Sequence, residues 1–159
     1  MPTLLPLKLL YACAAIVVAL PVFAAAPSTV FIEQMTSPEV AAAIRSGKTT
    51  IIMPIGGTEQ NGPHMALGKH NRRAAALAEK IALSLGDALV APVIAYVPEG
   101  SLAPPSGHMR FPGTITVPAG AYRQILESAA RSFKLHGFQD IVLLGDSGDY
   151  QGDNRSVAM

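Results

Sequence analysis

The chain has 159 residues, enough for one domain and short for two. Half of the residues are hydrophobic and 14% are charged, so the composition is far from that of disordered chains and allows a substantial core. The formal net charge is +1, and the sequence has neither a basic stripe nor interleaved aromatic residues. These properties argue against nucleic acid as a partner.

The N-terminal segment has the layout of a secretory signal peptide. A short positively charged region precedes the apolar run 9–23, and Val22 and Ala24 place small residues at positions −3 and −1 of a cleavage site. An uncleaved anchor is the alternative, but the run is shorter than the roughly 20 residues that span a bilayer. We therefore expect removal of residues 1–24 on export to the periplasm or the exterior. The mature domain, residues 25–159, would then have no stable membrane anchor.

The only cysteine, Cys13, lies inside this apolar run. After cleavage the mature chain can form no disulfide and offers no thiolate as nucleophile or metal ligand. A bound metal would therefore need carboxylate, imidazole, amide or hydroxyl ligands.

Helical and extended patterns alternate along the rest of the chain. In chain order they predict a helix capped by Thr36 with Pro38 in its first turn, a strand over 49–55, a helix from an Asn71 cap to Leu85, a strand over 88–96, a short strand over 114–117, a helix over 119–136 and a strand over 140–144. Strands rich in Val, Ile and Leu between helices are typical of a parallel sheet covered on both faces. The sequence thus predicts an α/β fold of three layers, αβα, with a mainly parallel sheet.

Three segments without a repetitive pattern carry most of the chemically active side chains. They cover residues 56–70, residues 97–113 and the turn after Gly145. In open α/β sheets, ligands bind beyond the carboxyl ends of the strands, where the first and third segments begin. We expect the functional site there.

The first segment combines Glu59, Asn61, His64 and His70. Carboxylate oxygen and imidazole nitrogen together suit zinc and other divalent cations. Without the HExxH spacing, a surface loop that caps the next helix explains the same residues.

The other two segments also admit two interpretations each; for His108 spacing alone favours the second, and for the two aspartates it favours neither. His108 can face a cleft, or lie solvated on a rigid crossover rich in proline and glycine. Asp146 and Asp149 can bind a metal, or form an acidic turn that caps a following helix.

Three motifs in this order resemble the creatininase family over essentially the whole mature chain. They read PIGGTEQNGPH in the first segment, GHMRFPGT in the second, and HGFQDIVLLGDSGDY through the last strand and its turn. The resemblance implies a creatininase-like α/β fold, hydrolysis of a linear or cyclic amide in a small-molecule substrate, and a homo-oligomer. Members of the family continue well beyond the last motif, so we expect this copy of the fold to be incomplete at its C-terminus.

The resemblance also implies two metal ions, zinc or manganese, at five positions of this sequence. By position these are Glu59, Asn61, His70, Ser147 and Asp149. Only Glu59 is identical to the family ligand. The residues at 70 and 149 are able substitutes, and the amide and hydroxyl at 61 and 147 are weak ones.

These departures leave two hypotheses. The first is a hydrolase with one metal on Glu59, His70 and Asp149, with His64 and Asp146 as reserve ligands and His108 as a catalytic residue that shapes the pocket. The second is an inactive exported binding or assembly module that keeps the fold without the metal centre.

Overall fold

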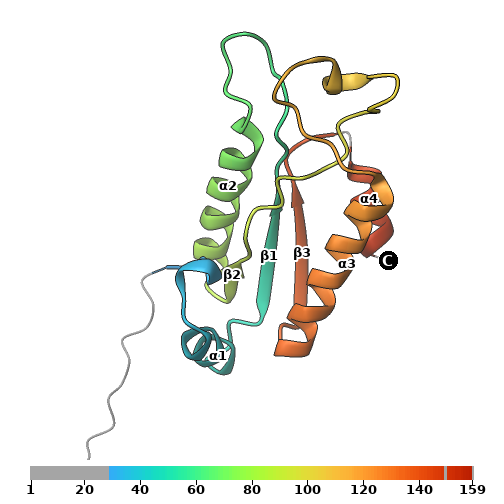
Figure 1. The fold of residues 1–159 in the computed structure, drawn as a ribbon. Helices are drawn as coiled ribbons and strands as arrows, with labels where there is room; N and C mark the ends of the chain where they lie inside the picture. The colour runs from blue at the N-terminus through green and yellow to red at the C-terminus, as the bar shows by residue number, and fades with distance from the viewer. Residues whose placement is uncertain (1–28, 149, 159) are drawn as a thin grey trace, which may run out of the picture.

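A computed structural model of the chain describes residues 29–148 and 150–158 (Figure 1). The predicted signal peptide, residues 1–24, and the candidate ligand Asp149 lie outside the described residues. Within the described part, no helix has the length and apolar character needed to cross a membrane.

The fold is built on a parallel sheet of three strands in the order β2-β1-β3. The central strand β1 (Thr50–Ile55) pairs with β2 (Ala88–Val90) on one side and β3 (Asp140–Gly145) on the other. All six residues of β1 are buried, as its continuous apolar pattern predicts. The predicted α/β class is confirmed.

Helix α2 (Lys69–Leu85) covers one face of the sheet. Its buried positions, His70, Ala74, Ala78 and Ala82, recur every four residues and so share one side of the helix. The small alanine side chains let the helix lie close against β1 and β2, where Ile52 and Val90 join the same cluster. His70 continues this buried stripe at the N-terminal end of the helix.

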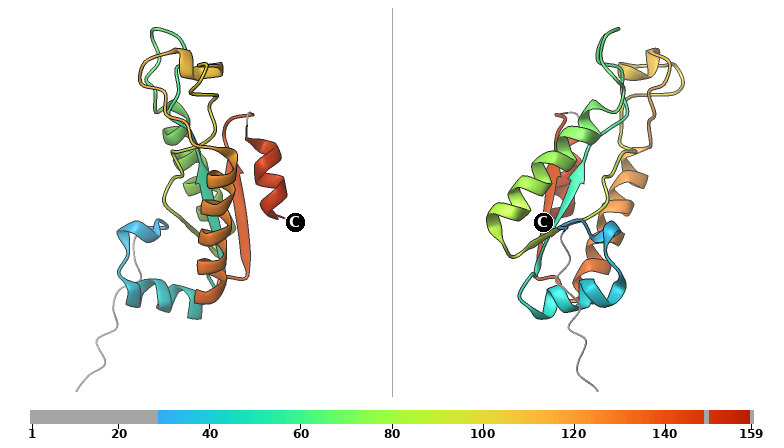
Figure 2. Two further views of the ribbon diagram at one scale, coloured as in Figure 1. Left: turned by 45° about the vertical axis from the view of Figure 1, so that its right-hand side comes forward. Right: turned by 90° about the vertical axis from the view of Figure 1, so that its left-hand side faces the viewer.

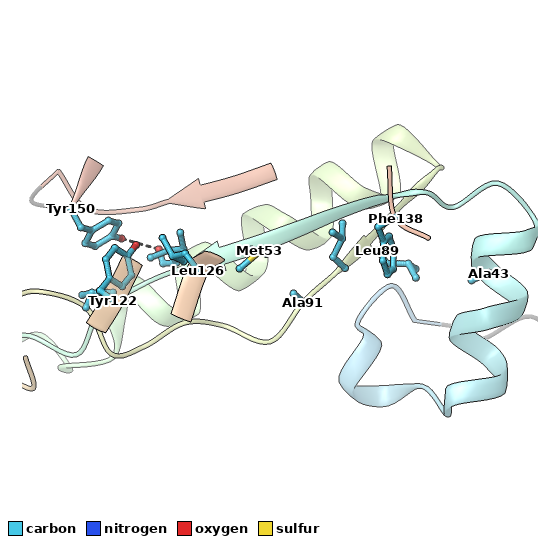
Figure 3. Close-up of a cluster of buried hydrophobic side chains, with 11 residues drawn as sticks. Ala43, Met53, Leu89, Ala91, Tyr122, Leu126, Phe138 and Tyr150 are labelled. Atoms are coloured by element: carbon cyan, nitrogen blue, oxygen red, sulfur yellow. Dashed lines mark hydrogen bonds between the residues drawn. The ribbon is translucent and has the colours of Figure 1, made fainter. Parts of the chain in front are cut away.

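Helices α1 (Ser37–Arg45) and α3 (Ala119–His136) contribute to the core on the opposite face (Figure 2). The largest cluster of buried side chains lies between them and the sheet (Figure 3). Tyr122 and Tyr150 lie at one end of this cluster, with ring centroids 5.8 Å apart, and Ala43 and Phe138 lie at the other. Two helical layers therefore enclose the sheet.

Three shorter helices complete the described part of the chain. The 3-10 helix η1 (Ile32–Gln34) precedes α1, and η2 (Gly107–Arg110) lies in the second long loop. Helix α4 (Gln151–Ala158) follows the last turn and contacts α3 and β3.

Three predicted elements were wrong in detail. Strand β2 ends at Val90 and not at 96, because Pro92 has no N–H to continue the ladder; only an isolated bridge between Ile94 and Ile55 follows. Residues 114–117 form no strand, since their backbone N–H groups make one hydrogen bond to each of two different loop segments and no continuous ladder. Helix α2 begins before Asn71, whose side chain instead accepts a hydrogen bond from the Gly57 N–H.

The start of α1 offers a test of its cap. The Glu39 carboxylate accepts hydrogen bonds of 2.7 Å from both the N–H and the hydroxyl of Thr36, which hold the pKa of Glu39 below its ordinary value of 4.5. A lowered folded-state pKa contributes stability above pH 4.5 that is lost as the pH falls through that lowered value. We expect the stability difference between wild type and Glu39→Gln to shrink as the pH falls below 4.5.

Urea denaturation at several pH values would measure this difference. Glu33→Gln is the matched control, because Glu33 is an exposed glutamate in the same region. A wild-type advantage over Glu39→Gln that stays constant down to pH 3 would contradict the prediction.

Candidate active site

The long loops meet at the end of the sheet where the strands have their carboxyl ends (Figures 1 and 2). The loop after β1 and the loop that contains η2 run side by side, and the turn after β3 begins at the same edge. Backbone bonds connect the first two, since the N–H of Ile115 donates to the carbonyl of Thr58 at 3.0 Å. The predicted location of the site at this edge agrees with this arrangement.

A chain of charged groups, buried except for Arg73, crosses this edge. Nε2 of His70 lies 2.8 Å from Oε1 of Glu59, and Nδ1 of the same ring lies 2.7 Å from Oδ2 of Asp146. Arg73, one turn along α2, places its guanidinium 3.1 Å from the other oxygen of Asp146. The stripe of α2 that packs on the sheet thus delivers His70 between carboxylates from the ends of β1 and β3.

A second group of side chains surrounds the other oxygen of Glu59. Nε2 of His108 lies 3.5 Å from Oε2 of Glu59, and Glu99 offers a carboxylate oxygen to the same small space. Ligand atoms of these three residues all lie within 4.8 Å of one another. Glu59 therefore contacts one imidazole through each of its oxygens.

The ionisation of Glu59 reflects these neighbours. Burial raises the pKa of Glu59, but a hydrogen bond with the Glu99 carboxyl and the nearby imidazoles of His108 and His70 lower it by more. Asn61 adds a hydrogen bond from Nδ2 to Oε1 of Glu59 at 3.3 Å. The net result is a pKa below the ordinary value, so Glu59 is a carboxylate at neutral pH.

Tyr150 ties the ends of β1 and β3 together beneath this site. Its buried hydroxyl donates to the carbonyls of Ile55 and Gly56, at 2.9 and 2.7 Å. The same oxygen accepts from the N–H groups of Asp146 and Ser147, at 3.1 and 3.0 Å. Burial raises the pKa of Tyr150, which keeps the hydroxyl proton in place to donate.

Removal of this hydroxyl is expected to loosen the edge. We expect Tyr150→Phe to lower the free energy of unfolding by about 1–3 kcal/mol, because buried carbonyl and N–H groups lose their partner. Tyr96→Phe removes the same atom from a ring that is 56% exposed and should change stability little. Urea denaturation of both variants would test this, and equal effects would contradict it.

Comparison with known proteins identifies the family of this chain. The sequence profile of creatininase (creatinine amidohydrolase) matches residues 33–157, which is most of the chain. The chain belongs to the creatininase family. It is 32% identical over 114 residues to the mycofactocin precursor peptide peptidase of Mycolicibacterium smegmatis, a match that covers 69% of this chain and 44% of that protein.

Creatinine amidohydrolase of Pseudomonas putida is 27% identical over 123 residues, covering 77% of this chain and 46% of the enzyme. The chain thus spans about half the length of the curated relatives that it matches. A crystal structure of creatininase superposes with a TM-score of 0.72 at 24% identity, over 83% of this chain and 50% of that one. Two other matching creatininases are described as an Mn form and as a Zn-Zn type.

The structure locates four of the five positions that the resemblance to creatininase implied. Glu59 and His70 are in direct contact. Asn61 lies beside them, but its side-chain oxygen accepts a hydrogen bond of 2.6 Å from the Lys69 ammonium. Ser147 is partly buried, and its N–H donates to Tyr150.

The remaining candidates divide between the buried cluster and the surface. The reserve ligand Asp146 lies in the cluster, whereas the His64 side chain is exposed on the loop after β1. The predicted catalytic residue His108 also reaches the cluster, and 33% of its side chain is exposed. It therefore lies at the rim of the site.

These positions can be tested for fit to a divalent cation. Both ring nitrogens of His70 are already in contact with carboxylates, and the side-chain oxygen of Asn61 already accepts a hydrogen bond from the Lys69 ammonium. A second ion at Asn61 would face this ammonium at close range. The residues described here therefore fit one cation beside Glu59 better than two.

Sequence reasoning missed Glu99, a buried member of the site. Its signal was a carboxylate soon after the apolar run 88–96, inside the Pro- and Gly-rich segment that also carries His108. Lys69 and Arg73, which contact Asn61 and Asp146, were also missed.

Proposed function

We propose that this chain forms part of an amidohydrolase that uses one divalent cation, zinc or manganese, to hydrolyse an amide C–N bond. The substrate class is a peptide or a small linear or cyclic amide. The observation that carries this proposal is the contact of buried Glu59 with imidazoles from two other segments, at 2.8 and 3.5 Å. Two relatives named peptidase and amidohydrolase support the class of reaction.

When bound, a divalent cation supplies Lewis-acid polarisation of the carbonyl and makes water more acidic. Hydrolysis breaks the C–N bond; the carbonyl carbon gains the hydroxyl of water and the nitrogen gains the proton. In this chain Glu59 would bind the cation. His70 bridges Oε1 of Glu59 and Oδ2 of Asp146 through its two ring nitrogens, and Arg73 balances the charge of Asp146.

A second candidate function is an inactive binding module that keeps the fold. The Lys69–Asn61 hydrogen bond favours it, because an ammonium there replaces part of the positive charge that a metal would supply. The two functions differ in metal binding: the hydrolase needs a bound cation for turnover, whereas the module keeps the fold without a metal centre.

The test uses the full purified chain, stripped with EDTA and then loaded with Zn²⁺ or Mn²⁺. Creatinine, a hydantoin and a set of short peptides would be incubated with each form, and products heavier by one water would be detected by mass spectrometry. We expect turnover of at least one amide only in the loaded forms. A folded chain that binds neither Zn²⁺ nor Mn²⁺ and cleaves none of these amides would support the binding module.

We also propose export and self-association for this protein. The apolar run 9–23 supports export, and the family resemblance supports a homo-oligomer. Fractionation of expressing cells and size-exclusion chromatography with light scattering would test the two.

A further inference from the structure

We propose that the cation ligands of this protein are Glu59, Glu99 and His108. This set shares only Glu59 with the positions that the family resemblance implies. The assignment rests on the proposed cation-dependent function, and it deepens that function by naming where the ion binds.

Two buried carboxyl groups pack close together at this site. Glu59 and Glu99 are 3% and 2% exposed, and their oxygens lie within 4.8 Å of each other. If both are ionised, Oε2 of Glu59 has no hydrogen-bond donor in the described part of the chain. Two adjacent buried negative charges require a shared proton or a cation, since neither is solvated.

The tautomer of His108 suits a metal ligand. Its Nδ1 lies 3.0 Å from the carbonyl of Gln60, an oxygen that can only accept, so Nδ1 carries the proton. In the neutral ring Nε2 then presents a lone pair, and this atom faces the carboxylate of Glu59 at 3.5 Å. A histidine that ligates a metal typically donates its other N–H to a carbonyl in this way.

The backbone near Glu59, Glu99 and His108 is shaped to hold these side chains together. Gly57, at φ +151°, leaves space for Glu99, because a Cβ atom there would lie 2.7 Å from Oε1 of Glu99. The N–H of His108 donates to the carbonyl of Glu99 at 3.1 Å, and the N–H of Glu99 donates to Thr116 at 2.9 Å. The two added ligands are therefore held together by direct backbone bonding.

The chemistry of these ligands matches the proposed ions. Two carboxylates and one imidazole suit zinc or manganese, and three protein ligands leave a coordination position for water or substrate. The exposed part of His108 provides access from solvent. His70 is left free to bridge Glu59 and Asp146, as it does in the structure.

The experiment measures binding of Zn²⁺ to the metal-free full chain by calorimetry. The test variants are Glu99→Gln and His108→Gln, and Ser147→Ala is the comparison at a family position. We expect near one ion per chain in the wild type and in Ser147→Ala. In each test variant we expect affinity to fall by more than the roughly 10- to 100-fold that loss of an outer partner costs.

Co²⁺ absorption spectra of the same proteins give an independent measure, since the visible bands depend on the ligands. Thermal melts monitored by circular dichroism establish which variants fold, and His108→Asn replaces His108→Gln if the latter does not. Wild-type Zn²⁺ affinity and unchanged Co²⁺ bands in folded Glu99→Gln would overturn the assignment, as would a wild type that binds no Zn²⁺. If the protein hydrolyses an amide but its metal binding does not depend on Glu99, this ligand set is rejected and the proposed function stands. If metal binding depends on Glu99 but no amide is hydrolysed, the ligand set stands and the proposed function is rejected.

Discussion

Replacement of Glu59 by glutamine is expected to abolish amide hydrolysis by the metal-loaded protein. The change keeps the shape of the side chain but removes the negative charge that both His70 and His108 face. A neutral amide oxygen is a weak ligand for a divalent cation. We expect kcat/KM to fall by at least about 10²- to 10³-fold, the range for loss of one electrostatic group in a catalytic site.

The matched control is Glu79→Gln, the same chemical change at an exposed position of α2. It should leave turnover and metal content unchanged. Metal analysis of both proteins after dialysis would show whether the lost activity follows the lost ion. Turnover of Glu59→Gln within twofold of the wild type would exclude this carboxylate from the reaction.

Replacement of Gly56 by alanine is expected to have the largest effect on stability. Gly56 follows β1 directly, where α2 begins beside it: an added Cβ atom would lie 2.1 Å from Oδ1 and 2.7 Å from the backbone Cα of Asn71. The backbone of a packed helix cannot move aside as a flexible side chain can. We expect the free energy of unfolding to fall by at least about 2–3 kcal/mol, as for other overpacked sites.

Gly120→Ala is the control for this prediction. Gly120 lies in α3, and a Cβ atom there would meet nothing within 4 Å. Because alanine favours a helix over glycine, this variant should be neutral or more stable by up to about 1 kcal/mol. Urea titrations of both would suffice, and a Gly56→Ala loss below 0.5 kcal/mol, on the scale of surface substitutions, would refute the close approach.

Much of the fold was predictable because its signals are local. The apolar spacing of residues 119–136 and the glycine at 137 predicted α3 with its observed bounds. The continuous apolar runs predicted β1 and β3 to within one residue. Errors arose where tertiary bonding overrode local preference, as for Asn71, which binds the loop after β1 and does not cap α2.

The site was predictable only in its location. The rule that ligands bind beyond the carboxyl ends of parallel strands correctly brought Glu59 and Asp146 to one edge. It carried no information on Glu99, because that residue follows no regular strand and its orientation depends on a loop that folds back on itself. The periodicity and spacing of residues in the sequence do not indicate how a side chain on such a loop is oriented.

The sequence by itself determined the order of the main helices and strands, apart from the strand expected at 114–117, the family, and the edge of the sheet where the polar residues gather. Only the tertiary structure decided which side chains meet: His70 with Asp146, 76 residues apart, and His108 with Glu59 and Glu99. The physical reason is that element identity follows from the spacing of neighbouring residues. Contacts among buried charges instead depend on loop backbone geometry, such as the conformation of Gly57, that no local pattern encodes.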